Sequence, residues 1–417
     1  MMMKKSLLST LLFILLSLIG YSQVYQWRGE GRKGIYDGTG LMNEWPESGP
    51  KMLWSKIDLP TGYSSPSIAY ETIFLTGVRD ESDVLTALDM MGNIKWQTTF
   101  GRAWVRNYPA SRCTPTIDDH KLYVTSGMGE IACLDADNGH IIWKVDAHGI
   151  YEGQFGMFGL NESPLLLGDK VFYTTGGEKT MMIALNKQNG ELIWASESMH
   201  EAPAFVSPLL IEKNGIQIIT TLTKNHIIGV NPDNGKIVWK FDYRPYAPSG
   251  RTYDNHANTP LYEDGSLFIT SGYNRKAVKL KLADDLASVS VEWTNEVLDS
   301  QHGSVIKIGN YIYGSSWDNN TSGKWICVNW TTGETVYEEM WMSKGPIIAA
   351  GDYLYIYDEK YGNVGLVKAS PESFKIISSF QVTLGKKGPF WPHPVIDKGI
   401  LYLRHEDAFM AYSIKSE

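Results

Sequence analysis

Residues 113–146, CTPTIDDHKLYVTSGMGEIACLDADNGHIIWKVD, contain one complete copy of the pattern that decides the fold. A short opening at Pro115 begins a first strand, and KLYVTSG supplies a second strand of β-branched and aromatic residues. ACLDADNGHIIW then gives a third strand, a turn at Asn138-Gly139 and a fourth strand that carries Trp143. Asn and Gly tolerate the positive φ that a tight hairpin requires. The stretch therefore predicts a four-stranded meander.

The same pattern recurs eight times along the chain, with 42 to 52 residues between successive strand openings. Periods of this size are typical of four-stranded β-propeller blades. An open β-sandwich is the alternative, but the copies agree in both order and spacing. The openings lie at Pro66, Pro115, Pro164, Pro208, Pro260, Ser304, Pro346 and Pro394.

The eighth copy ends before its fourth strand, and a matching strand occurs near the other terminus. The stretch PKMLWSKIDL, residues 50–59, carries Trp54 in the expected context. Closure by this strand removes the exposed sheet edge that an open ring would have. We therefore expect an all-β, eight-bladed β-propeller with four-stranded blades, its ring closed by an N-terminal strand in the last blade.

Residues 1–22 differ in character from the rest of the chain. Two lysines precede an apolar run at residues 7–19, and Gly20 and Ser22 occupy the two positions that a signal peptidase inspects. The run is too short for a typical membrane span, although a retained anchor is the alternative. We expect a signal peptide cleaved after Ser22 and a single propeller domain over residues 23–417. The mature chain would then be exported to the periplasm or outside the cell, as a monomer without an integral membrane segment.

Composition excludes some partners. The chain has 417 residues, 38 Lys and Arg against 46 Asp and Glu, and a formal net charge of -8. An acidic surface repels nucleic-acid backbones and anionic lipid, so we expect no nucleic-acid partner. Three cysteines, an odd number without a CxxC pair, predict buried thiols rather than a disulfide framework.

The repeated (A/C)LDxxxGxxxW pattern resembles the pyrroloquinoline-quinone-type propeller repeat. Quinoprotein alcohol dehydrogenases and the lipoprotein of the outer-membrane β-barrel assembly machine share this repeat. The resemblance extends from Trp27 to Ser413. The beginning WRGEGRKGIYDGTGLMNEWPESGPKMLW and the ending WPHPVIDKGILYLRHEDAFMAYSIK are similar to an exported bacterial branch, often labelled alcohol or polyvinyl-alcohol dehydrogenase-like. The resemblance implies the fold, and pyrroloquinoline quinone as a cofactor by resemblance alone.

The sequence departs from the quinone-dependent enzymes of this kind at their diagnostic residues. Those enzymes carry two adjacent cysteines over the cofactor, whereas Cys113, Cys133 and Cys327 are far apart in the sequence. No motif fixes a calcium-binding carboxylate–Asn set or a catalytic Asp, and no CxxCH haem attachment occurs. We therefore assign no metal ligands.

The residues just before each inner strand should face the central funnel of a propeller. Arg forks bind carboxylate or phosphate, and aromatic rings stack on planar or sugar faces. Such a ring of side chains predicts a site for an anionic or polyhydroxylated ligand, such as an acidic sugar or a quinone carboxylate. Alternatively, loop Arg and Tyr side chains simply cover apolar surface. With residues of the connecting loops, the candidate ligand-binding set is Arg106, Arg112, Glu162, Arg251, Asn258, Gln301, Trp317, Lys344, Trp391 and His393.

Three residues are candidates for catalysis. His256 and His302 open consecutive blades, and a His of near-neutral pKa is a possible general base. Tyr253 is a candidate acid, and the pair would suit proton abstraction beside a carboxylate. The alternative is that each His bonds backbone at a loop corner. HExxH and GxSxG signatures are absent, which argues against common zinc and serine hydrolases.

The sequence thus predicts an exported propeller that binds a partner through its funnel face without catalysis. The partner would be a small-molecule or glycan ligand, or an envelope protein. Two alternatives stay open: a quinone-dependent alcohol dehydrogenase-like oxidoreductase, and a carbohydrate-active enzyme resembling a polysaccharide lyase that uses funnel His, Tyr and Arg.

Overall fold

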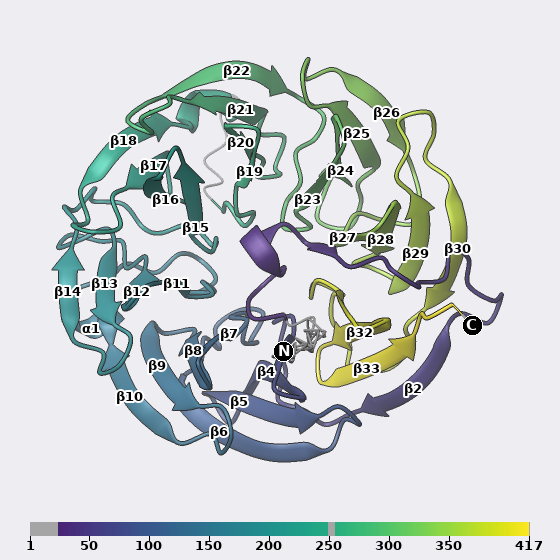
Figure 1. Ribbon diagram of the computed structural model, residues 1–417, viewed down its shortest axis with the longest axis horizontal. Helices are drawn as coiled ribbons and strands as arrows, with labels where there is room; N and C mark the ends of the chain where they lie inside the picture. Colours follow the sequence, from purple (N-terminus) through teal and green to yellow (C-terminus); the bar gives the residue numbers. More distant parts are fainter. Residues whose placement is uncertain (1–23, 249–254, 417) are drawn as a thin grey trace, which may run out of the picture.

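The computed structural model describes residues 24–248 and 255–416, whose strands form eight sheets arranged in a ring (Figure 1). Seven sheets have four antiparallel strands, and the eighth gains a fifth, parallel strand. The eight-bladed β-propeller expected from the repeat is therefore confirmed. The described chain has three short helical turns: η1 (Glu30–Arg32), α1 (Ala147–Ile150) and η2 (Arg244–Tyr246).

The first four blades follow the chain from the innermost strand outward. Blade 1 consists of β3 (Ser67–Ala69), β4 (Thr72–Arg79), β5 (Ser82–Asp89) and β6 (Ile94–Arg102). Blade 2 consists of β7 (Thr116–Asp118), β8 (Lys121–Thr125), β9 (Glu130–Asp135) and β10 (Ile141–Asp146). Blade 3 consists of β11 (Leu165–Leu167), β12 (Lys170–Tyr173), β13 (Ile183–Asn186) and β14 (Leu192–Ala195). Blade 4 consists of β15 (Leu209–Lys213), β16 (Ile216–Leu222), β17 (His226–Val230) and β18 (Ile237–Asp242).

The remaining blades complete the circle. Blade 5 consists of β19 (Leu261–Glu263), β20 (Ser266–Ile269), β21 (Ala277–Leu282) and β22 (Val289–Asn295). Blade 6 consists of β23 (Val305–Ile308), β24 (Tyr311–Ser315), β25 (Trp325–Asn329) and β26 (Thr335–Glu339). Blade 7 consists of β27 (Ile347–Ala350), β28 (Tyr353–Tyr357), β29 (Asn363–Lys368) and β30 (Ile376–Gln381). Blade 8 consists of β31 (Val395–Asp397), β32 (Ile400–His405), β33 (Ala408–Ser413) and β2 (Lys51–Lys56).

Blade 8 closes the ring as the sequence predicts. Strand β2 pairs antiparallel with β33, with Trp54 opposite Ala411. The Trp54 ring packs against Phe409 of the same blade, 5.6 Å between ring centroids. Strand β2 and the three C-terminal strands thus lie in one sheet, and each blade of the described chain has its outer strand.

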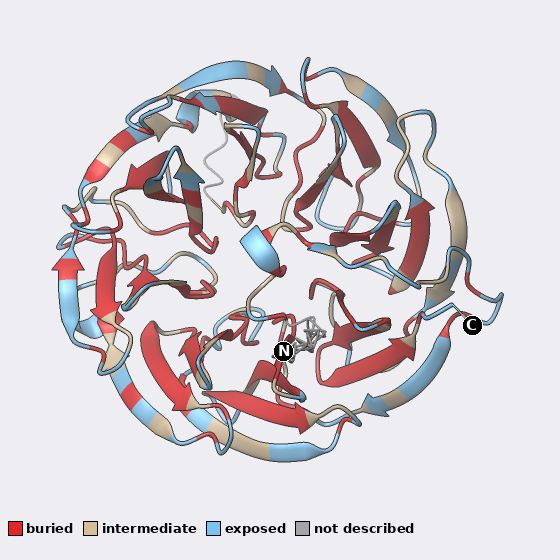
Figure 2. Ribbon diagram, in the orientation of Figure 1, coloured by how far each residue is buried: buried red, intermediate tan, exposed pale blue. Residues whose placement is uncertain are grey.

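The core lies between the blades, where the middle strands are buried and the outermost strands are exposed (Figure 2). The recurring Trp side chains join neighbouring blades: Trp143 Nε1 donates to the Lys187 carbonyl of the next blade at 3.0 Å. The glycine of the same turn allows this contact, since a Cβ on Gly190 would lie 2.8 Å from the Trp143 ring. The repeated Asn-Gly and Trp are therefore two halves of one interface between blades.

The N-terminal segment forms a plug, residues 24–34, that the repeat analysis did not foresee. Figure 1 shows its η1 turn near the centre of the ring. Its backbone pairs with β3 through Val24 and Ile68, and its Gly34 carbonyl accepts from Ala349 of β27 at 2.8 Å. Beyond it, β1 (Ile35–Tyr36) adds the parallel fifth strand to blade 7.

Two buried arginines hold the plug in place. Arg28 donates to the carbonyls of Ile347 at 2.8 Å and Val305 at 2.9 Å, which lie in blades 7 and 6. Arg32 donates to the Pro164 carbonyl of blade 3 at 3.0 Å. The plug therefore ties together blades on opposite sides of the axis.

The sequence also predicted features that fall outside the described residues. The proposed signal peptide at residues 1–22 lies there, as do the candidate site residues Arg251 and Tyr253. Within the described ranges, no helix is both long and apolar enough to span a membrane.

Candidate functional site

A cavity of about 230 Å³ lies in the funnel, on the face where the inner strands begin. Its walls come mainly from the segments that directly precede the inner strands, and seven of the eight blades contribute. The plug supplies Trp27 to the cavity, and the next buried residues, Arg28 and Arg32, fill the ring beyond it. The cavity therefore ends at the plug.

Aromatic rings form a continuous arc along one side of the cavity. The ring centroids are 5.8 Å apart for Phe205 and Phe158, 6.0 Å for Phe158 and Tyr108, and 5.1 Å for Tyr108 and Trp391. Tyr63 then lies 4.9 Å from Trp391. The arc thus runs over the inner ends of blades 4, 3, 2, 8 and 1, and it gives this wall an apolar surface.

The opposite side, over blades 5 and 6, is more polar, although Tyr273 of blade 5 also contributes a ring. Asn255, Gln301 and Asn320 bring side-chain amides to the wall, and Thr259 brings a hydroxyl. Asn161 of blade 3 also lines the cavity, and its Oδ1 atom is buried without a hydrogen-bond partner. Amides both donate and accept hydrogen bonds, so this side suits a ligand with hydroxyl groups.

Five of the sequence-predicted site residues line this cavity: Arg112, Gln301, His302, Trp391 and His393. Arg112, however, is engaged by the protein itself. Its guanidinium donates to the carbonyls of Tyr108 at 2.7 Å, Ala110 at 3.1 Å and Phe158 at 3.3 Å. The side chain thereby fastens two connecting loops together, which is a structural role at the edge of the cavity.

Lys344 lies behind the wall in a buried network with a residue that the sequence analysis missed. Its Nζ pairs with Glu359 and donates to Gln301 Oε1 at 2.8 Å. Both charged side chains are buried, at 2% and 3% exposure. Burial lowers the pKa of Lys344 and raises the pKa of Glu359, while the attraction between the two charges opposes both shifts. The signal for Glu359 was its place in the YDEKYG loop, which reaches the same face.

His302 stands between this network and the aromatic arc. Its Nε2 lies 3.2 Å from Glu359 Oε2, but neither ring nitrogen has a well-aligned hydrogen bond. Its ring contacts Trp391 edge to face at 5.1 Å. Burial, together with the charge of Lys344, holds the pKa of His302 well below 6.5. A neutral imidazole both donates and accepts, and a pKa this low makes it a weak base.

His393 is neutral for similar reasons. Burial, with the charge of Arg28, lowers its pKa well below 6.5. Its Nε2 lies 3.1 Å from the Gly303 carbonyl, which can only accept, so this nitrogen carries the proton.

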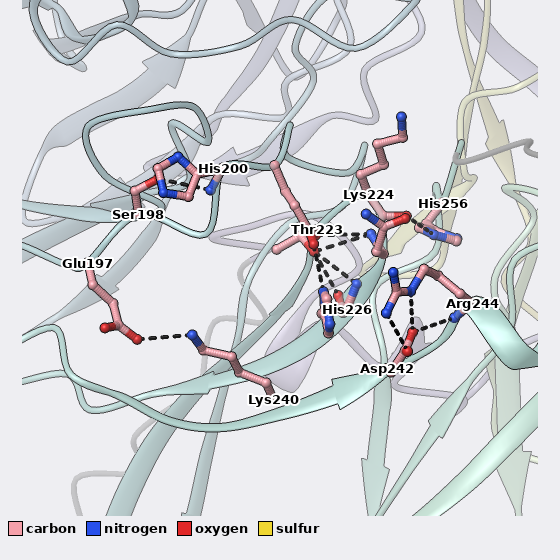
Figure 3. Close-up of polar contacts among 12 residues, drawn as sticks. Glu197, Ser198, His200, Thr223, Lys224, His226, Lys240, Asp242, Arg244 and His256 are labelled. Atoms are coloured by element: carbon pink, nitrogen blue, oxygen red, sulfur yellow. Dashed lines mark hydrogen bonds and ion pairs between the residues drawn. The ribbon is translucent and has the colours of Figure 1, made fainter.

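His256 does not line the cavity, contrary to the expectation that it and His302 share a pocket. Its Nε2 lies 3.1 Å from the Lys224 carbonyl (Figure 3), and its Nδ1 lies 2.5 Å from Ser271 Oγ. Burial, with the charge of Arg275, lowers the pKa of His256 to about 3. The ring therefore fixes a loop corner and is a poor general base.

Four further predicted residues lie outside the cavity wall for identifiable reasons. Asn258 bridges two blade connections, accepting from the Ser304 amide at 2.9 Å. Trp317 packs against Tyr273 at 5.1 Å. Arg106 is exposed over the Trp104 ring, and Glu162 is buried behind the wall.

Glu162 leads to a prediction about pH. It accepts from the Thr174 amide at 3.2 Å, and burial raises its pKa to about 8 despite the nearby Arg32. A carboxyl with a raised folded-state pKa contributes stability that is complete below its unfolded value, about 4.5, and is lost as pH rises through 8. Glu162→Gln should therefore gain stability relative to the parent as pH rises from about 5 to 8.5.

Urea unfolding at both pH values measures this gain. Glu296→Gln is the control, because a hydrogen bond from Lys276 lowers the pKa of Glu296, so this exposed carboxyl is ionised throughout the range and its loss should have the same effect at both pH values. Parallel pH profiles for the Glu162→Gln variant and the parent would contradict the prediction.

Comparison with known proteins shows which family and which relatives the chain resembles. A family model described as outer membrane protein assembly factor BamB matches residues 80–339. An uncharacterized protein of Rickettsia conorii is 27% identical over 252 residues, 55% of this chain and 55% of that protein. The quinoprotein alcohol dehydrogenase PedH of Pseudomonas putida is 26% identical over 210 residues, 47% of this chain and 32% of that enzyme.

Solved structures have the same ring of blades. BamB from Moraxella catarrhalis superimposes with a TM-score of 0.65 at 17% identity, covering 87% of this chain and 99% of that chain. At this identity the likeness concerns the fold. The sequence matches span only 55% and 32% of the lengths of the two curated relatives described above.

Proposed function

The chain belongs to the family described as outer membrane protein assembly factor BamB, and we propose on that premise that it is an exported, non-catalytic binding protein of the cell envelope. In this proposal residues 1–22 are its signal peptide, and its funnel face holds the ligand. The observation that carries the proposal is the cavity itself. It has an aromatic wall, a facing polar wall and the plug at its end. Concave, mostly apolar sites with a few convergent polar groups are where proteins bind small molecules.

The candidate acid–base groups support binding rather than catalysis. His256 is outside the cavity, and the pKa values of both cavity histidines lie well below 6.5. A general base is most effective when its pKa is near the working pH. The lyase-like alternative therefore lacks a histidine base of suitable pKa among the described residues that line the cavity.

A quinone cofactor also fits this cavity poorly. Pyrroloquinoline quinone carries three carboxylates, and the enzymes that use it bind calcium beside it. Among the described lining residues the one permanent cation is Arg112, which already serves three carbonyls, and no carboxylate lines the wall. The three cysteines are separate buried thiols, so no disulfide of adjacent cysteines covers the site. We therefore derive no redox step.

A protein partner on the same face is the second candidate, and an exposed apolar rim favours it. Val105, Tyr108, Phe155 and Met157 lie on the two loops beside the cavity and are 38% to 61% exposed. The loops contact each other, since Asn107 donates to the Met157 carbonyl at 3.1 Å. Exposed apolar groups gathered in one place are typical of interaction sites. The family name, an assembly factor, is compatible with such a partner.

The test of the proposal is ligand-dependent stabilisation of the mature protein. Thermal unfolding is followed with a panel of neutral sugars, uronic acids, pyrroloquinoline quinone with calcium, and short peptides. At least one class should raise the melting temperature, because a ligand that binds only the folded state stabilises it. Trp391→Ala should abolish that rise, while Ile142→Ser on the exposed outer strand β10 should preserve it. If no class binds, the cavity has no small-molecule role, and the rim is left as the binding site.

A further inference from the structure

The chemistry of the cavity specifies the class of ligand, on the premise that the proposed function is right. Its two sides differ sharply: an arc of five aromatic rings lies over blades 4, 3, 2, 8 and 1, and amides face it from blades 5 and 6. A ligand that fits must therefore have an apolar face and an edge of hydrogen-bonding groups.

The charged groups around the cavity are already neutralised or engaged by the protein. Arg112 donates to three backbone carbonyls, and Lys344 pairs with Glu359 in the buried network. Both cavity histidines are neutral at pH 7, and the described lining includes no carboxylate. A cation would thus find no carboxylate on the described wall, and an anion would meet only Arg112, three of whose five N–H donors already serve carbonyls, so burying either charge is unfavourable.

The polar atoms without partners are best satisfied by a ligand group that both donates and accepts hydrogen bonds. Asn161 Oδ1 is buried and accepts no hydrogen bond, and neither nitrogen of His302 has a well-aligned one. Buried polar atoms without partners are rare in folded proteins. Hydroxyl groups satisfy both kinds of atom, because each has one donor and two acceptor positions.

The arrangement of the rings argues against two other classes of ligand, flat aromatic molecules and quaternary ammonium groups. Trp391 is tilted by 59° to Tyr63 and by 47° to Tyr108, so these rings do not form a parallel slot for a flat aromatic ligand. Their centroids lie only 4.9 Å and 5.1 Å apart, so they contact one another. No space is left between them for a quaternary ammonium group, which aromatic cages enclose.

We infer that the cavity binds one uncharged sugar ring of a glycan, with its C–H face on the aromatic arc and its hydroxyls on Asn161, His302 and the facing amides. The ring of a pyranose has an apolar face and a hydroxyl edge, which matches the two sides of the cavity. The proposal replaces the anionic ligand that Arg112 suggested in the sequence, since that guanidinium serves the loops.

Matched pairs of sugars test this inference by isothermal titration calorimetry and saturation-transfer NMR on the mature protein. Each pair differs in charge alone: methyl glucoside against methyl glucuronide, and methyl galactoside against methyl galacturonide, with methyl N-acetylglucosaminide as a third neutral probe. We expect at least one neutral glycoside to bind, and its uronide to bind about tenfold more weakly or worse, because the carboxylate would be desolvated while Arg112 stays bonded to the loop carbonyls.

Variants locate the sugar. Trp391→Ala should weaken binding of the neutral glycoside by more than about tenfold, and Asn161→Ala by about five- to tenfold, through loss of stacking and of one hydrogen bond. Tyr25→Ala, an exposed aromatic residue of the plug that does not line the cavity, should leave the affinity unchanged. A circular-dichroism melt checks that each variant is folded.

The outcomes separate the inference from the function on which it rests. Equal or tighter binding of a uronide, or preferential binding of pyrroloquinoline quinone or a peptide, overturns the neutral-sugar inference and leaves a ligand-binding funnel standing. Absence of any glycoside signal at tens of millimolar also overturns it. If none of these probes binds at all, the proposed function fails with it.

Discussion

Replacing β2, Lys51–Lys56, by the length-matched segment GSGSGS should destroy the cooperative unfolding of the propeller. The replacement removes Trp54 from the Phe409 ring and the ladder from β33, and it leaves the edge of β33 unpaired. A Gly-Ser segment has neither the apolar contacts nor the strand preference to re-form the pairing. The loss should be on the order of 5 kcal/mol or more, larger than most single substitutions cause.

Urea unfolding monitored by fluorescence and by circular dichroism measures the loss. We expect a lower midpoint, transitions that no longer coincide between the two probes, and aggregation through the free edge. The control is Met52→Ser with Leu53→Ser, two side chains of β2 that are 41% and 44% exposed, which should change stability little. Unfolding of the GSGSGS variant at the parent's midpoint would show that the ring does not depend on this closure.

The sequence alone was enough to predict the ring, its closure and the order of strands and turns within a blade. The reason is physical: most blades use the same Trp, turn and glycine to pack on a neighbour, as Trp96 does on Gly139, so the residues of one interface recur along the chain. Repetition of a contact makes its pattern visible in the residues. The closing strand was recognised because Trp54 carries the same signature.

The plug was not predictable in the same way. The strand β1 that follows it pairs with blade 7 over two residues, too few for an alternating strand pattern, and the Arg side chains of the plug bond backbone carbonyls. Carbonyls are present at every residue, so such bonds leave no complementary partner to find in the sequence.

The position of the cavity could be predicted from the sequence, but the contacts of its side chains only in part. Residues preceding the inner strands do form the cavity wall, because all inner strands begin on one face. The sequence did not show in which direction each side chain points. Arg112 turns to the loop carbonyls and His256 to the Lys224 carbonyl, and only the folded loops determine such turns. Glu359 was missed because its partners, Lys344 and His302, come from separate blade connections.

Arg28→Met should release the plug and destabilise the protein strongly. Arg28 is 2% exposed, and although burial lowers its pKa to about 10 it keeps its charge at pH 7. It donates to four carbonyls, those of Arg32, Lys33, Val305 and Ile347. Methionine fills a similar volume but donates nothing, so these buried acceptors lose their partner. We expect a loss of about 3–5 kcal/mol, as when one member of a buried polar network is removed.

Amide hydrogen exchange distinguishes release of the plug from general destabilisation. The Ile68 amide donates to Val24 at 2.9 Å and the Ala349 amide to Gly34 at 2.8 Å, so both should lose protection before the amides of β5, which lies inside blade 1. Lys33→Met is the control, because the Lys33 side chain is 41% exposed and pairs with Glu263, so its loss should be small. Because Trp27 lines the cavity beside Arg28, the Arg28→Met variant should also bind its ligand more weakly. Parent-like stability and unchanged exchange at Ile68 and Ala349 would show that the plug is held without this guanidinium.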